Sequence, residues 1–483
     1  MRHQTYHHRG QLMISPRLVP RTLSRIPIYS KIQYRRASTM AAAAGSTAHR
    51  IYVSPENTGL WRVKQTEEAS KKVSELLQED LEKHHVFFNK DGFHNHISHH
   101  LLALYGTGAG ASSLQLGYNN NTDYQRPTLP PHEQVIEELK SWDHAKKYLG
   151  QEKYYPDFLR FFQKEIENRG YEEVLNEYVF KGDETADELF SRLFAGFLHP
   201  VIQLMYGLEW HQPAIVAMAL AQTAVHSNDL GPFLHEAEKA ARSSSTDMST
   251  ISSLYHAVHD DKKLANSVHM SDSNKVRDGV LAHARDEMLK IVSQVKAKPE
   301  ELEERTVEMY NCAVWAAASA AVHPPKGKMT RFDFFLIHHV NASPVWLVIK
   351  DSPWISTETK VRLLEWKIRM DLMQYAARAC PPLSVEKIAS YKPKDSAGKS
   401  AHEILSRVHN LDDDGHVIKL GRAAAICHEV SKKYEDKDWL PLKGDDLWLK
   451  VYHLIVESAE APGQRWVRTT GLEEAWKDIP SAD

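Results

Sequence analysis

The chain has 483 residues, and 60 Lys and Arg stand against 63 Asp and Glu, for a formal net charge of −3. This balance excludes the strongly basic surface of a nucleic-acid-binding protein, and no apolar run reaches the roughly 18 residues that predict a membrane span. Three widely spaced cysteines, Cys312, Cys380 and Cys427, exclude a disulfide framework and a zinc ribbon. Neither a nucleic acid nor a membrane is expected as a partner, and the oligomeric state stays open.

The N-terminal segment differs from the rest in composition. No acidic residue precedes Glu56, whereas 8 arginines occur up to Arg50. Such a composition is typical of a mitochondrial transit peptide. A wrongly chosen start codon is the alternative, because Met40 opens a run of small residues that resembles an ordinary protein start. We therefore divide the chain into a leader, residues 1–48, and a catalytic domain, residues 49–483. The expected location is the cytoplasm, or the mitochondrion if the leader is a transit peptide.

Apolar residues at helical spacing dominate the remainder, and no alternating strand run or βαβ rhythm is found. The pattern predicts helices over 67–84, 99–105, 131–142, 157–169, 186–198, 200–206, 213–226, 232–241, 249–259, 276–296, 299–322, 331–339, 356–379, 401–410, 416–434 and 446–459. The Ala-rich stretches 215–225 and 312–322 are apolar on all sides, which is typical of helices inside a large core. The predicted fold is all-α: a single large multi-helix domain with buried Ala-rich helices and no Rossmann domain.

A glycine-rich segment, Gly106–Ala111, resembles a dinucleotide-binding fingerprint. That fingerprint binds phosphate only when it follows a strand, whereas here it follows the predicted helix 99–105. We therefore expect it to end that helix and to open a loop over 106–117.

The 28 histidines are the unusual feature of the composition. His96 and His100 are four residues apart, so on a helix they share one face and can bind one metal ion. His99 points elsewhere. The alternative is that the pair only caps a helix and forms hydrogen bonds.

Three further histidines lie in apolar surroundings. His199 stands before Pro200 at a helix junction, where it could instead bond a carbonyl freed by the break. His226 continues the buried stripe of helix 213–226, and Asp229 is a candidate carboxylate to orient it. His338 lies under two phenylalanines, so we expect an inward side chain there.

The segment Asp412–Lys419 begins with an acidic run that can cap a helix starting at His416. Lys419 then faces the core, where burial lowers the pKa of an amine. A neutral lysine can act as a base or nucleophile or react with carbon dioxide to give a carbamate. Alternatively it extends to the surface or pairs with a carboxylate. Many neutral imidazoles with few carboxylates favour iron, copper or zinc.

These segments together resemble the fungal questin oxidase-like family. The resemblance runs over about residues 52–460 and rests on Phe93–Tyr105, Leu198–Ile202, Tyr206–Glu209, Ala219–His226, Phe332–His338, Asp414–Lys419 and Trp448–Lys450. It implies an oxygenase of secondary metabolism that carries out Baeyer–Villiger-type oxidation or oxidative ring opening of an anthraquinone or related aromatic polyketide. It also implies NADPH as a cofactor, although no flavin or nicotinamide fold is predicted.

The resulting hypothesis places His100, His199, His226 and His338 around a non-haem iron that activates dioxygen, with Lys419 completing the shell. His96 and His416, with Lys419, are the candidate catalytic acid–base groups. NADPH would then reduce the substrate or the metal. Two alternatives stay open: a hydrolase or lyase with a histidine-bound zinc, and a non-catalytic helical scaffold with surface-facing histidines.

Overall fold

The computed structural model describes residues 45–394 and 400–482. The expected leader, residues 1–48, lies almost wholly outside the described residues. The described fold begins just before the expected boundary, because Ala48 is already buried. Its N–H donates to Glu167 Oε1 at 2.6 Å, and its carbonyl accepts from Gln163 at 2.9 Å.

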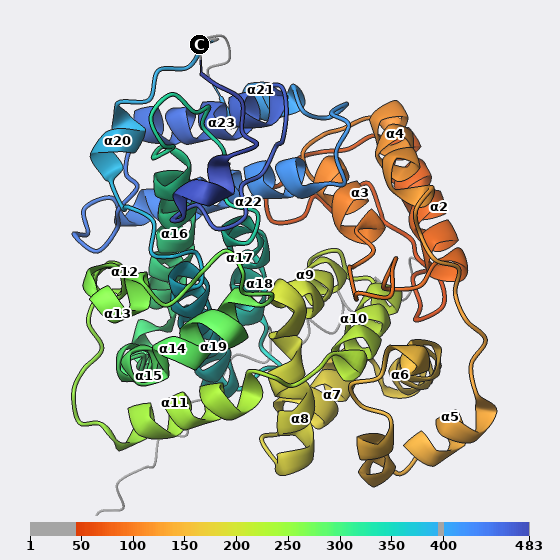
Figure 1. The fold of residues 1–483 in the computed structure, drawn as a ribbon. Coiled ribbons are helices and arrows are strands. Elements are labelled where there is room, and N and C mark those ends of the chain that lie inside the picture. The colour runs from red at the N-terminus through yellow and green to blue at the C-terminus, as the bar shows by residue number, and fades with distance from the viewer. Residues whose placement is uncertain (1–44, 395–399, 483) are drawn as a thin grey trace, which may run out of the picture. The chain divides into compact units, whose positions relative to one another are not determined.

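Helices joined by turns make up the described part of the chain, in which no strand occurs beyond isolated bridges. The predicted all-α class is therefore confirmed (Figure 1). The α-helices are α2 (Glu67–Lys83), α3 (Ile97–Tyr105), α4 (Ala111–Thr122), α5 (Glu133–Leu139), α6 (Tyr155–Arg169), α7 (Tyr171–Leu175), α8 (Glu184–Leu193), α9 (Ala195–Glu209), α10 (Pro213–Val225), α11 (Gly231–Ser243), α12 (Ile251–Asp260), α13 (Lys262–Ala265), α14 (Leu281–His283), α15 (Arg285–Val292), α16 (Leu302–Ala321), α17 (Leu336–Ala342), α18 (Val345–Asp351), α19 (Thr357–Ala376), α20 (Val385–Ala389), α21 (Ala401–Ser406), α22 (His416–Ser431) and α23 (Asp445–Glu460). None of them is long and apolar enough to cross a membrane.

The two Ala-rich helices behave as predicted. All residues of α10 after Pro213 are buried, and α16 is buried from Thr306 to its end. Helices without a polar face lose nothing by being enclosed, because their backbone groups bond internally. They form the centre of the core.

The structure differs from the predicted elements in several places. The predicted helix 276–296 is divided into a π-helical segment (Lys275–Val280), α14 and α15, and the short helices α7, α13, α18 and α20 were not predicted. Two further differences lie close to the centre of the fold. The expected loop 106–117 is wrong, because α4 begins at Ala111. The small residues of this segment show no apolar pattern that would predict a helix, yet α4 forms and packs on α2 and α3. The expected helix 331–339 begins only at Leu336, because the Asp333 carboxylate accepts the N–H groups of Phe335 and Leu336 and starts the helix there.

Four helices form a closed cycle of contacts in the centre of the described fold. α3 packs on α9, α9 on α17, α17 on α22, and α22 on α3, while α10 packs along α9 (Figure 1). These helices come from distant parts of the sequence. Side chains that point inward from their ends therefore meet at one place.

A buried ion pair fastens two members of this cycle. Arg422 of α22 and Glu209 of α9 form two hydrogen bonds, and both side chains are 1% exposed. Gly106, at the end of α3, gives this guanidinium room, because a Cβ there would lie 2.5 Å from Arg422 Nε. The pair fixes α22 against α9, and thus His416 of α22 against His199 of α9.

Candidate functional site

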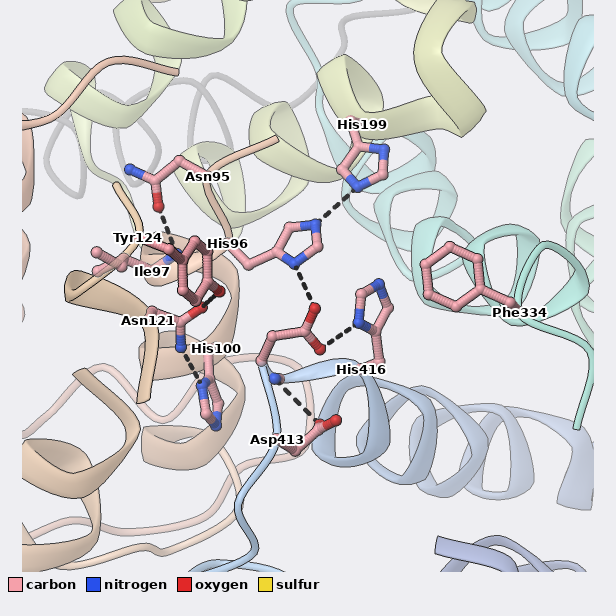
Figure 2. Close-up of polar contacts among 12 residues, drawn as sticks. Asn95, His96, Ile97, His100, Asn121, Tyr124, His199, Phe334, Asp413 and His416 are labelled. Carbon is pink, nitrogen blue, oxygen red and sulfur yellow. Dashed lines mark hydrogen bonds and ion pairs between the residues drawn. The ribbon is translucent and has the colours of Figure 1, made fainter. Parts of the chain in front are cut away.

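Four imidazoles form a closed ring at the centre of the helix cycle. His96 immediately precedes α3, His199 lies in α9, His338 in α17, and His416 opens α22. Neighbouring ring centroids are 5.2, 4.9, 4.9 and 4.6 Å apart around the cycle 96–199–338–416. All four side chains are buried. We call this set the imidazole ring; Figure 2 shows three of its members.

Backbone carbonyls orient two of its members. His199 Nδ1 lies 2.6 Å from the Gly196 oxygen, and His338 Nδ1 lies 2.6 Å from the Phe334 oxygen. A carbonyl only accepts, so the proton of each neutral imidazole belongs on Nδ1. The Nε2 lone pair of both rings is then free and directed inward.

One carboxylate orients the other two members. Asp414 Oδ1 lies 2.5 Å from His416 Nδ1, and Asp414 Oδ2 lies 3.3 Å from His96 Nδ1 (Figure 2). Burial acts to raise the pKa of Asp414, but His416 and His96 outweigh it and hold that pKa well below the ordinary value. An ionised carboxylate accepts the Nδ1 proton of His416 and lies within ion-pair distance of His96 Nδ1. In the neutral form of each ring this places the proton on Nδ1 and the lone pair on Nε2.

The inward nitrogens approach one another closely. His96 Nε2 lies 3.0 Å from His199 Nε2, and His338 Nε2 lies 3.1 Å from His416 Nε2. Two lone pairs at this distance repel unless a cation lies between them. A shared proton is disfavoured, because burial lowers the pKa of His96 to about 3 and those of His199 and His338 well below the ordinary value. Among the described residues, His96, Asp414 and His416 each offer one ligand atom within 4.8 Å of the others, with His199 paired to His96 and His338 paired to His416. Imidazole nitrogens with one carboxylate are donors that a transition metal accepts.

Two more histidines adjoin the imidazole ring. His94 stacks on His199 with centroids 3.8 Å apart and planes within 5°, and its Nε2 lies 2.8 Å from His226 Nε2. The expected role of Asp229 is wrong, because its carboxylate accepts from Ser227 Oγ while the His226 ring faces His94. His226, which caps α10, thus reaches the site through His94.

A left-handed turn inside α9 makes this packing fit. Gly196, Phe197 and Leu198 have φ values of 52°, 54° and 66°. A Cβ on Gly196 would lie 2.5 Å from His226 Cε1, so only glycine leaves room for that ring. Each non-glycine residue in this conformation costs about 1–2 kcal/mol. The turn also directs the Gly196 carbonyl at His199. The strained backbone therefore orients a residue of the site.

Lys419 lies one helical turn after His416 on α22 and is 2% exposed, as the sequence predicted for a core-directed side chain. Burial lowers the pKa of its amine to about 8, although Asp414 and Asp413 act in the opposite direction. Its Nζ has no hydrogen-bond partner within the described part of the chain. A buried amine without a partner is costly, and a neutral one at the edge of the imidazole ring is reactive.

The structure brings together most of the residues singled out from the sequence. His96, His199, His338 and His416 form the imidazole ring, with Lys419 and His226 beside it. His100 is not among them: its Nδ1 lies 3.0 Å from Asn121 Nδ2, away from His96 (Figure 2).

The reason for the separation of His96 and His100 is local. His96 precedes the first turn of α3 with φ −102° and ψ 0°, so the helical face that the spacing assumed begins only after it. His100 instead packs against Gly415, where a Cβ would lie 2.6 Å from His100 Cβ.

Sequence reasoning missed two site residues. His94 stood in the quoted histidine segment, and its separation of two from His96 is the spacing that puts two side chains on one side of an extended chain. Asp414 was seen only as part of a helix cap, which is the role of its neighbour: Asp413 accepts the N–H groups of Gly415 and Val417.

The model of the questin oxidase-like family matches residues 93–424, which include every residue of this site. The chain belongs to the questin oxidase-like family. The resemblance drawn from the sequence is thereby confirmed. Like its relatives in that family, the chain is an oxidoreductase, so the hydrolase and scaffold alternatives are set aside.

Named relatives match nearly the whole chain. Questin oxidase of Aspergillus fumigatus is 35% identical over 451 residues, covering 90% of this chain and 100% of that protein. Baeyer-Villiger oxidase ptaJ of Pestalotiopsis fici is 34% identical over 446 residues, with 91% and 100% covered. Oxidoreductase AflY of Aspergillus parasiticus is 33% identical over 446 residues, with 85% and 89% covered.

Proposed function

We propose that this chain carries out a Baeyer–Villiger-type oxidation, or an oxidative ring opening, of an anthraquinone or related aromatic polyketide in fungal secondary metabolism. Relatives named questin oxidase and Baeyer-Villiger oxidase, which align over nine tenths of this chain, support the reaction class. The observation that carries the proposal is the imidazole ring with Asp414, because the donor group His96, Asp414 and His416, with His199 and His338 beside it, offers a place for an oxygen-activating centre.

The proposal includes a non-haem iron held at the imidazole ring. His199 and His338, already expected as ligands, are joined by His96 and His416, which take the place expected for His100. His226 stays a ligand candidate through the His94 pair. Bound iron would supply activation of dioxygen. Asp414 would raise the basicity of the two imidazoles it orients and fix their tautomers.

Lys419 has two chemical roles in the proposal. As a neutral amine it accepts a proton from an acidic phenol of the substrate. Alternatively, the amine adds to carbon dioxide and loses a proton, which gives an N-carboxylate with two oxygen donors beside the imidazole ring. Both roles require the unprotonated form, and burial favours that form.

The electron balance distinguishes the two reactions. Insertion of one oxygen atom between a carbonyl carbon and its neighbour sends the second oxygen atom to water. That route consumes two electrons and two protons, which NADPH and a proton supply. Ring cleavage that incorporates both atoms of dioxygen needs no net reductant. NADPH is therefore required only if the reaction is oxygen insertion.

The deciding experiment uses the full-length chain purified without a histidine tag. We expect about one iron per chain, dioxygen uptake with 1,8-dihydroxyanthraquinone or a methylated derivative, and label from ¹⁸O₂ in the product. One labelled atom with one NADPH consumed per turnover indicates insertion, and two labelled atoms without NADPH indicate cleavage. Product formation under strict exclusion of dioxygen would overturn the oxygenase proposal, and oxidation by chain that holds no metal would overturn the iron.

A further inference from the structure

Phenyl rings border the imidazole ring where it approaches solvent. The Phe334 ring lies 4.9 Å from both His338 and His416 between centroids. Phe335 lies 5.4 Å from Phe334 and 4.6 Å from Phe197, which itself is 6.3 Å from His338. Phe334 and Phe335 are half-buried, and Phe197 is 38% exposed. Three neighbouring phenyl rings, one of them exposed, therefore lie beside His338.

Phe197 is the exposed member of the left-handed turn. Gly196 makes room for His226 and Leu198 is fully buried, whereas Phe197 contacts Phe335 and is still 38% exposed. Its backbone has a φ of 54°. An apolar side chain gains nothing from that exposure. A strained residue beside a reactive centre indicates a role in binding.

Arginines hold the other two phenyl rings. The guanidinium of Arg378 lies over Phe335 at 4.3 Å from the centroid, and that of Arg468 lies over Phe334 at 4.9 Å. Arg378 is itself buried and bonded to Thr469 Oγ1 at 3.3 Å. A cation over an aromatic face attracts the ring. Phe334 and Phe335 are thus fixed walls, whereas Phe197 stands on the turn opposite Phe335.

We propose that Phe197, Phe334 and Phe335 form an aromatic clamp that binds a flat, fused-ring substrate against His338, and that Phe197 determines its affinity. The clamp rests on the proposed function for the identity of that substrate. Flat aromatic molecules fit because offset stacking and edge contacts with phenyl rings favour planar partners at centroid distances of about 4.5–7 Å. A saturated ring of the same size gains less from the same walls.

The test measures binding to the full-length chain by fluorescence titration with two probes. One is 1,8-dihydroxyanthraquinone, and the other is anthracene-2-sulfonate, a flat tricycle without quinone oxygens. We expect Phe197→Ala to weaken both probes about tenfold or more, equivalent to about 1.4 kcal/mol, and Phe197→Trp to stay within about threefold of wild type. Tyr52→Ala is the matched control, since Tyr52 is 36% exposed and lies on another surface.

Iron content and the far-ultraviolet circular dichroism spectrum, both unchanged in Phe197→Ala, show that the variant is intact. If Phe197→Ala binds the two probes as wild type does, or if wild type binds neither probe, the clamp is overturned. If wild type binds both probes and Phe197→Ala loses them, but no oxidation is detected, the clamp stands and the proposed function fails. If Phe197→Ala oxidises the substrate with an unchanged KM, the proposed function stands and the clamp is overturned.

Discussion

His96 and His416 each approach one oxygen of a single carboxylate, that of Asp414, although His96 precedes α3 and His416 opens α22. The nitrogen–oxygen distances are 3.3 and 2.5 Å. The two rings are therefore oriented by one group, and any change at Asp414 reaches both of them. The same carboxylate determines which nitrogen of each ring faces the centre of the site.

Asp414→Asn should weaken metal binding about 10–100-fold, as removal of an orienting partner typically does. An amide can accept from one imidazole but offers a hydrogen to the other, so one ring must change tautomer or turn away. Iron affinity measured by competition with a chelator tests this. Asp412→Asn, an exposed neighbour in the same loop, is the control, and equal affinity in both variants would contradict the role of Asp414.

Replacement of ring histidines should remove the metal. We expect His199→Ala and His338→Ala each to lower iron content from about one per chain to a small fraction, because each removes an inward lone pair. His100→Gln should keep its iron, since His100 bonds Asn121 outside the imidazole ring. Elemental analysis of the three variants decides the point. Loss of iron in His100→Gln as well as in His199→Ala and His338→Ala would favour the ligand set expected from the sequence alone.

Activity should depend on pH through Lys419. Its pKa is lowered to about 8, so the neutral, reactive amine increases as pH rises through that value. If the amine is carboxylated, activity at pH 7 should rise with added bicarbonate, and ¹³C-bicarbonate should give a carbamate signal by NMR. Lys419→Met should abolish both the signal and the activity. A bicarbonate response that persists in Lys419→Met would exclude the carbamate.

Gly196→Ala should destabilise the fold by about 2–4 kcal/mol, from the steric clash and the left-handed backbone together. The new Cβ would lie 2.5 Å from His226 Cε1 and 3.0 Å from His94 Cε1, and both of these side chains pack against other rings. Gly182→Ala separates the two causes, because Gly182 has φ +79° with nothing within 4 Å of its Cβ. Urea unfolding should show a clearly smaller loss of unfolding free energy for Gly182→Ala than for Gly196→Ala. Equal losses would mean that the His226 and His94 rings shift to accommodate the new Cβ.

Glu209→Gln should cost about 3–5 kcal/mol, because it leaves the buried Arg422 guanidinium without its charge partner. The exposed pair of Glu236 and Arg285 is the control, and Glu236→Gln should cost less than about 1 kcal/mol. Denaturant unfolding of the metal-free chain measures both. A loss below about 1 kcal/mol for Glu209→Gln would show that α9 and α22 are held together by apolar packing alone.

The sequence predicted the fold class and most helices, because apolar spacing and Ala-rich composition act locally. The sequence also predicted that Lys419 is buried, because this residue lies on the apolar, core-facing side of α22. Helix starts were less predictable. Asp333 delays α17 to Leu336 through hydrogen bonds that the apolar pattern does not show.

The candidate site was predicted in part for a related reason. His199, His226 and His338 stood out because each is a polar residue in an apolar segment. The place of His100 depends on the residue where α3 begins, and the turn at Gly196–Leu198 depends on rings from other segments. The pairing of His94 with His226, 132 residues apart in the chain, has no local signal in the sequence.

The C-terminal tail lies outside the stretch matched by the family model, yet it reaches the aromatic clamp. Asp333 Oδ2 accepts the N–H groups of Thr469 and Thr470, both at 2.9 Å, next to Phe334 and Phe335. The site and the phenyl rings beside it thus lie within residues 93–424, whereas Arg468, Thr469 and Thr470 of the tail hold the segment that carries two of those rings. Exchange of tails between family members would then shift Phe334 and Phe335 without replacing any histidine of the imidazole ring, so the choice of substrate and the oxidation itself would vary independently.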